Sequence, residues 1–139
     1  MDARYLIQLE NFVRTVDIEV SVLLRMVDTG VLPAAIKQQK ALADSLAAAQ
    51  AAGAKAPAQA KALVEYASLV DDAIGKRNAL DAVAKKVHQG HAEPPAHARS
   101  ICDDVRPAMA ALRAACDALE TRTDASAWPF PSYHQLLFQ

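Results

Sequence analysis

Apolar residues recur along the first half of the chain at the three- and four-residue spacing of an amphipathic helix. One row within residues 2–29 consists of Tyr5, Leu9, Phe12, Val16, Leu23 and Met26, and a second row consists of Leu6, Val13, Val20, Leu24 and Val27. Two adjacent rows predict a helix that is covered on more than one side. The pattern resumes after Pro33, so residues 2–53 form either one long bent helix or two helices with a tight corner.

Glycine and proline mark the first reversal of the chain. Gly53 suits the left-handed position that ends a helix, and Pro57 suits the first turn of the next one. We expect that next helix to run to about Val87. Its predicted core face consists of Leu63, Tyr66, Val70, Ile74, Leu80 and Val87.

The second reversal covers residues 90–95, which hold one glycine and two prolines. A last long helix is predicted from about His97 to Arg122. Its apolar row has the most regular spacing in the chain and consists of Ile101, Val105, Ala108, Leu112, Ala115 and Leu119. Because the row keeps its phase across Pro107, we expect a kink there rather than a break.

These patterns predict an all-α fold. We expect an antiparallel bundle of three long helices, or four if Pro33 breaks the first, followed by an aromatic, proline-containing C-terminal tail. No segment alternates with period two over the length of a strand. Residues 1–139 are expected to form a single helical domain, in which residues 1–123 are the bundle and residues 124–139 are a docking tail.

Four of the seven aromatic residues lie in the last twelve positions of the chain. Two prolines in this tail oppose a helix and favour an extended strap. Exposed rings on such a strap would form an apolar patch, so the tail is predicted to dock on its own bundle or on a neighbouring surface. The predicted docking residues are Trp128, Phe130, Tyr133 and Phe138, and 133–138 is a candidate short helix.

Charge and hydropathy narrow the function classes. The formal net charge is -1 and no block of basic residues occurs, so neither the whole chain nor any part of it favours nucleic-acid binding. The N-terminus lacks the layout of a signal peptide, and no uncharged stretch reaches the roughly 18 apolar residues that a membrane span needs. We therefore expect a soluble, cytoplasmic protein with no membrane partner.

The two cysteines, Cys102 and Cys116, lie fourteen positions apart in one predicted helix. At 1.5 Å per residue this places them about 21 Å apart, too far for a disulfide within a straight helix. Both fall on the apolar face of that helix. We expect them to be buried structural thiols rather than redox residues.

Three histidines gather around the second reversal: His88, His91 and His97. Two of them three residues apart suggest zinc, but no Cys or carboxylate stands at a familiar ligand spacing and Gly90 interrupts the helix between them. Solvent-exposed loop histidines are the favoured interpretation.

The acidic pairs Asp71–Asp72 and Asp103–Asp104 lack the Glu-x-x-His pattern of dinuclear sites in bundles, so we interpret them as solvated helix faces. The chain also has no glycine-rich phosphate loop. The residues therefore indicate no catalytic, cofactor or metal site, and this chain alone is expected to be a binding or assembly module rather than an enzyme.

Two segments carry longer motifs. The first has LENF at 9–12, DIE at 17–19 and VLPAA at 31–35. The second has VRPAM at 105–109 and ends in WPFPSYHQLLF at 128–138, which is the more specific of the two. Both resemble the C-terminal region of type III glutamine synthetases, a family of large ATP- and magnesium-dependent ligases that join ammonia to glutamate and assemble as dodecamers.

The resemblance implies a non-catalytic helical C-terminal domain that supports the fold or the oligomer of the full-length enzyme. The family's catalytic residues, with ATP and magnesium, would belong to an upstream catalytic domain, and none of them maps onto this chain. The implied partners are that domain and sister subunits of a homo-oligomer. The alternative is a free-standing helical adaptor or regulatory protein that docks through its aromatic tail.

Overall fold

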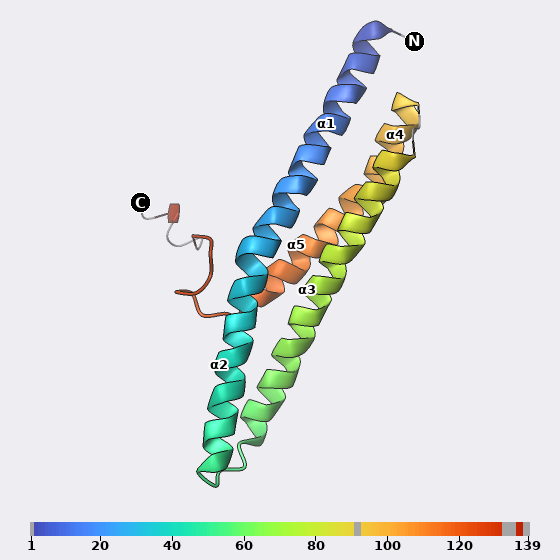
Figure 1. The fold of residues 1–139 in the computed structure, drawn as a ribbon. Coiled ribbons are helices and arrows are strands. Elements are labelled where there is room, and N and C mark those ends of the chain that lie inside the picture. Colours follow the sequence, from blue (N-terminus) through green and yellow to red (C-terminus); the bar gives the residue numbers. More distant parts are fainter. Residues whose placement is uncertain (1, 91–92, 132–135, 138–139) are drawn as a thin grey trace.

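The computed structural model describes residues 2–90, 93–131 and 136–137. Within these residues the chain is helical and contains no strand. The helices form three rods (Figure 1). The first rod consists of α1 (Ala3–Met26), the turn η1 (Val27–Val31) and α2 (Leu32–Ala51), the second of α3 (Pro57–Gln89), and the third of α4 (Pro94–Ser100), the turn η2 (Ile101–Val105) and α5 (Arg106–Glu120).

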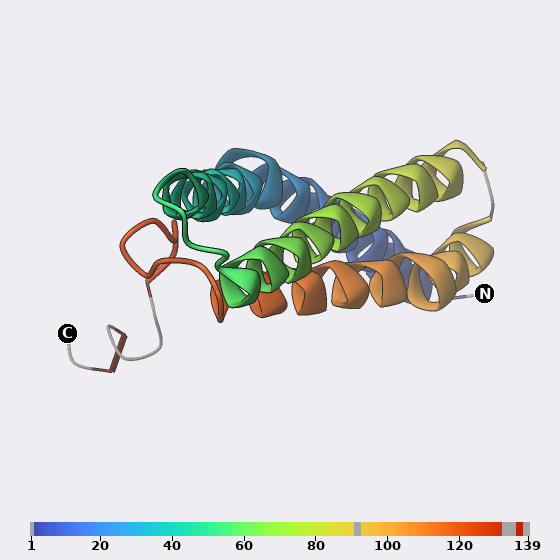
Figure 2. The ribbon, with the colours of Figure 1, turned by 90° about the horizontal axis from the view of Figure 1, so that it is seen from below.

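The rods run antiparallel (Figure 1), and Figure 2 shows them from below. Helix α3 packs on both α2 and α5, and α1 packs on α4. The N-terminal turns of α1 extend past the ends of α3 and α4 (Figure 1). The all-α bundle predicted from the sequence is confirmed, with three long helices rather than four.

Pro33 bends the first rod without breaking it. The turn η1, which ends two residues before Pro33, is a π-helical turn, in which the N–H of Leu32 donates to the carbonyl of Val27, five residues back. Proline has no N–H and its ring collides with the carbonyl four residues earlier. A wider turn just upstream relieves that collision at the cost of one extra residue, so the helix continues into α2.

Pro107 is accommodated in the same way. It also stands two residues after a π-helical turn, η2, in which the N–H of Arg106 donates to the carbonyl of Ile101. The expectation that Pro107 does not break the helix is confirmed. Both prolines of the helical interior are thus preceded at the same spacing by a turn that holds one residue more than an α-helical turn.

The first reversal forms as predicted. Gly53 has φ +89°, the left-handed conformation that suits glycine, and Pro57 begins α3. The second reversal is shorter than predicted, because α4 begins at Pro94 rather than near His97. Proline at the start of a helix gives up an N–H that has no partner there, so Pro94 opens the helix.

The apolar row of the third rod packs into the core. Ile101, Val105, Leu112, Ala115 and Leu119 are buried. Met109 is also buried, and Ala108 of the predicted row is half-buried.

On α3 the predicted core face is buried at Tyr66, Val70 and Leu80 and half-buried at its other positions, Leu63, Ile74 and Val87. On α1 the core positions are Val16, Val20 and Val27. The expectation that both rows of α1 are covered is wrong at their edges, because only one side of α1 faces the bundle. Tyr5 and Met26 are 47% and 41% exposed.

A charged contact ties the bend of the first rod to α3. The guanidinium of Arg77 donates to both carboxylate oxygens of Asp28, from Nε at 2.8 Å and from Nη2 at 2.7 Å. The hydrogen bond from Arg77 holds the pKa of Asp28 below its usual value. Arg77 also lies 3.4 Å from Asp81, so one guanidinium bridges η1 and the next turn of α3.

Candidate functional site

The tail folds back onto the bend of the first rod. A Cβ placed on Gly30 would lie 3.1 Å from Cγ and 3.3 Å from Cβ of Pro129, and 3.6 Å from Cζ of Phe130. Such an approach is possible only because residue 30 has no side chain. The π-helical turn that accommodates Pro33 is therefore also the surface on which the tail rests.

Two of the predicted docking residues, Trp128 and Phe130, are half-buried and pack against the core. Their ring centroids are 6.3 Å apart and the rings are inclined at 78°, an edge-to-face arrangement. The other two, Tyr133 and Phe138, lie outside the described residues, as does most of the candidate helix 133–138.

Hydrogen bonds fix the beginning of the tail to α3. The hydroxyl of Tyr66, a residue only 2% exposed, lies 2.6 Å from Oγ1 of Thr123. Because Thr123 donates its own proton to the carbonyl of Leu119, Tyr66 is the donor between the two hydroxyls. Arg122, just after the C-terminal end of α5, donates to Glu65 at 2.8 Å. The hydrogen bond from Arg122 lowers the pKa of Glu65.

A turn at Asp124 fixes the next part of the tail to α2. The N–H of Asp124 donates to Oε1 of Gln38 at 3.2 Å, and Oδ1 of Asp124 accepts from both the N–H and the hydroxyl of Ser126 at 2.8 Å. The bond from the Ser126 N–H lowers the pKa of Asp124. Residues 123–131 are thus a folded loop with a tight turn rather than the extended strap that the prolines suggested.

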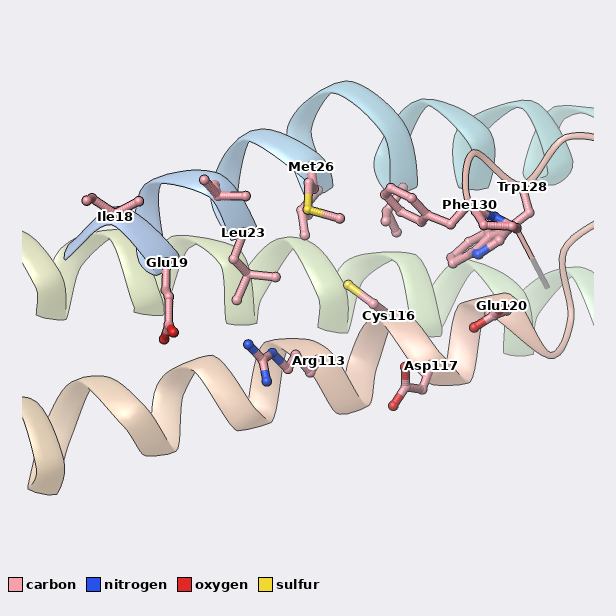
Figure 3. Close-up of a pocket in the computed structure, with 14 residues that line it drawn as sticks. Ile18, Glu19, Leu23, Met26, Arg113, Cys116, Asp117, Glu120, Trp128 and Phe130 are labelled. Carbon is pink, nitrogen blue, oxygen red and sulfur yellow. The ribbon is translucent and has the colours of Figure 1, made fainter. Parts of the chain in front are cut away.

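Between α1, α5 and the tail lies an apolar groove of about 570 Å³. Its α1 wall includes Ile18, Val22 and Met26 at steps of four residues. Figure 3 shows Trp128 and Phe130 closing one end. The complete lining is Ile18, Glu19, Val22, Leu23, Met26, Val27, Val31, Arg113, Cys116, Asp117, Glu120, Trp128, Phe130 and Pro131.

The two cysteines differ in their surroundings. Cys116 is half-buried at the groove, on the same wall as Arg113 (Figure 3), and burial raises its pKa to about 11. Cys102 is exposed, so the prediction that it is buried is wrong. It lies within η2, where the wide turn rotates it away from the face of Val105 and Met109. Both thiols are free.

The charged residues of the groove do not form a cofactor site. Glu19 and Arg113 point into it from opposite walls, and Asp117 and Glu120 stand on the α5 side (Figure 3). Nowhere in residues 2–90, 93–131 and 136–137 do three His, Cys, Asp or Glu side chains gather as a metal site would require. One arginine among separated carboxylates and an apolar wall does not fit magnesium and ATP, the cofactors implied for the full-length family enzyme.

The histidines of the second reversal have separate environments. His88 is exposed, with Nδ1 at 3.8 Å from Asp17. His97 lies in α4 and is half-buried rather than exposed in a loop, so that part of the prediction is wrong. Its Nε2 is buried and has no hydrogen-bond partner among the described residues. His91 lies outside the described residues.

Both acidic pairs are exposed, as predicted. Asp72 lies 3.9 Å from Lys76 on α3. Asp103 and Asp104 stand in η2. Their side chains are exposed to solvent in the middle of the third rod.

Sequence reasoning missed the groove and the role of Gly30. The rows of α1 included Met26 as a core residue, and Ile18 and Val22 belonged to neither row. The available signal was their spacing: an apolar row outside the core rows, at steps of four, marks a second apolar face. Gly30 indicated only a helix end or bend, because the residue that rests on it lies 99 positions away in the sequence.

One comparison with known proteins finds a match to part of the chain. Residues 1–50, which comprise α1, η1 and nearly all of α2, match the family model described as the glutamine synthetase C-terminal domain. A search of curated proteins found no match. In the part of the chain that the structure describes, no helix is both long enough and apolar enough to cross a membrane. The resemblance to the C-terminal domain of glutamine synthetases predicted from the sequence is thus confirmed over residues 1–50.

Proposed function

We propose that this chain is the non-catalytic C-terminal helical domain of a type III glutamine synthetase and that it supports the fold or oligomer of the ATP-dependent enzyme. The family match over residues 1–50 carries the proposal. The type III assignment draws in addition on the motifs at 105–109 and 128–138, outside the matched segment. The proposed partners are the upstream catalytic domain and sister subunits.

The start of α1 is the surface we assign to those partners. Its N-terminal turns project beyond α3 and α4 (Figure 1), and they belong to the matched segment. Tyr5 and Ile7 there are 47% and 57% exposed. A projecting helix end with large apolar side chains on it gains stability when another surface covers them.

The genomic reading frame before residue 1 tests the assignment first. A glutamine synthetase catalytic domain in frame is expected. A stop codon and a separate start of translation there would instead favour the alternative, a free-standing helical adaptor. The isolated chain is expected to form no glutamine from glutamate, ammonia and ATP, and sustained turnover would overturn the non-catalytic role.

The supporting role is tested in the full-length enzyme with Ile7→Asp, which places a charge on the projecting end of α1. The matched control is Val64→Asp, a similar change at an exposed valine of α3 that is 69% exposed. Mass photometry should show a smaller share of the largest oligomer for Ile7→Asp and an unchanged share for Val64→Asp. Equal oligomer populations and equal thermal stability for both variants would contradict the role of this surface.

A further inference from the structure

The apolar groove leaves large side chains uncovered. Ile18, Val22 and Met26 are 60%, 50% and 41% exposed and follow one another on a single face of α1. Three exposed apolar side chains at steps of four residues on one helix face form a docking face for an apolar segment.

The tail leads directly into this groove. Pro131, the last residue described before 136–137, belongs to its lining together with Trp128 and Phe130. The anchors at Gly30, Gln38 and Tyr66 hold the tail at this end. The part of the tail that is described up to Pro131 therefore ends at the groove.

The residues after Pro131, 132–139, have the composition of a segment that binds an apolar groove. They contain two leucines and two aromatic residues and no Asp, Glu, Lys or Arg. Leu136 and Leu137 are 57% and 60% exposed. The apolar row of the groove and the C-terminal leucines are thus both uncovered on the same molecule.

The segment is long enough to cover the groove. Six residues beyond Pro131, at about 3.3 Å each, reach roughly 20 Å. The row from Ile18 to Met26 spans eight residues of helix, about 12 Å at 1.5 Å per residue. The C-terminal leucines can therefore contact every residue of the row without displacing the anchored part of the tail.

We propose that the C-terminal leucines, Leu136 and Leu137, bind in cis in the groove between α1 and α5. A short tether gives the segment an effective concentration in the mM range, which favours its own groove over that of a second copy. A further partner of this groove would have to displace the tail. The contact is made within one chain and does not rest on the proposed function.

Methionine methyl NMR tests the proposal on the complete chain, since Met26 lines the groove and Met109 is a core residue 6% exposed. The double variant Leu136→Ser/Leu137→Ser is expected to shift the Met26 methyl signal by more than its line width and to leave that of Met109 in place. The control is Val64→Ser on α3, which should move neither signal. An unchanged Met26 signal in the double variant would overturn the proposal.

Cysteine cross-linking gives a second, independent measurement in a Cys102→Ser/Cys116→Ala background. Air oxidation should join Val22→Cys to Leu137→Cys within one chain at least about ten times faster than it joins Val64→Cys to Leu137→Cys, because a disulfide needs Cα atoms within about 7 Å. Equal rates would overturn the proposal. Disulfides that join two chains would overturn it in favour of docking on a second copy.

Discussion

Pro129 rests on the bare backbone of Gly30, so closely that a Cβ on residue 30 would stand 3.1 Å from Cγ of the proline. The two residues join the tail to the bend of the first rod. This contact sets two effects of one substitution against each other, since alanine stabilises a helix relative to glycine but here has no room.

Gly30→Ala is therefore expected to displace the tail. Elsewhere in a helix the change gains about 0.5–1 kcal/mol, and Gly75→Ala, at an exposed position of α3 with nothing within 4 Å, is the control that should show this gain. Gly30→Ala should not show it. Emission of Trp128, the single tryptophan, should shift to the red in Gly30→Ala alone. An equal gain in both variants with unchanged emission would contradict the close contact.

The ion pair between Asp28 and Arg77 predicts a dependence of stability on acid. Because the pKa of Asp28 is lower in the folded chain than its ordinary 3.8, the pair's contribution is complete above that value and is lost as the pH falls through the lower, folded pKa. Asp28→Asn should cost about 0.5–1 kcal/mol at pH 7, discounted for its partial exposure, and less at pH 3. Urea unfolding at both pH values measures the difference.

Asp71→Asn, at an exposed carboxylate of α3, is the control for that measurement. Its cost at pH 7 should stay below roughly 0.5 kcal/mol, as for most surface substitutions. A loss for Asp28→Asn that is the same at pH 7 and pH 3 would show that the pair does not contribute through its charge.

The two thiols should differ in reactivity. With a pKa of about 11, Cys116 is about one part in a thousand thiolate at pH 8, and it is half-buried at the groove, whereas Cys102 is exposed. Iodoacetamide should label Cys102 at least about ten times faster than Cys116, read by peptide mass spectrometry. Equal rates at the two positions would mean that the contact between α1, α5 and the tail opens readily in solution.

Tyr66→Phe tests the link between α3 and the start of the tail. Removal of the hydroxyl loses the hydrogen bond to Thr123 and should lower the free energy of unfolding by about 1 kcal/mol. Tyr5→Phe, at a tyrosine that is 47% exposed, is the matched control and should change it by less than roughly 0.5 kcal/mol. Indistinguishable denaturation midpoints would rule out a stabilising role for this bond.

Much of the bundle could be predicted because the residues that end and begin its helices act through local backbone geometry. Gly53 and Pro57 act through their own backbone geometry, and the row from Ile101 to Leu119 reports the helix on which it lies. The two π-helical turns could not be predicted in this way. They differ from α-helix by a single residue, and the row of the third rod keeps its apolar character whichever turn lies beneath it.

The candidate site could be predicted only in part for a related reason. Clustering of aromatic residues singled out Trp128 and Phe130, since a property of the tail alone reveals it. Their docking surface depends on Gly30 and Gln38, which have no local pattern that marks them. The exposure of Cys102 was mispredicted because its phase depends on the width of η2.

The extra residue in η1 also sets the register of everything that follows it in the first rod. Ala35 is completely buried, with 0% of its surface exposed, whereas its neighbour Ile36 is 55% exposed. If the same residues formed an α-helical turn in place of η1, α2 would be rotated by about 100°, and Ala35 would move to the exposed place that Ile36 now occupies. The width of this one turn therefore decides which side chains of α2 are buried in the bundle and which face the solvent.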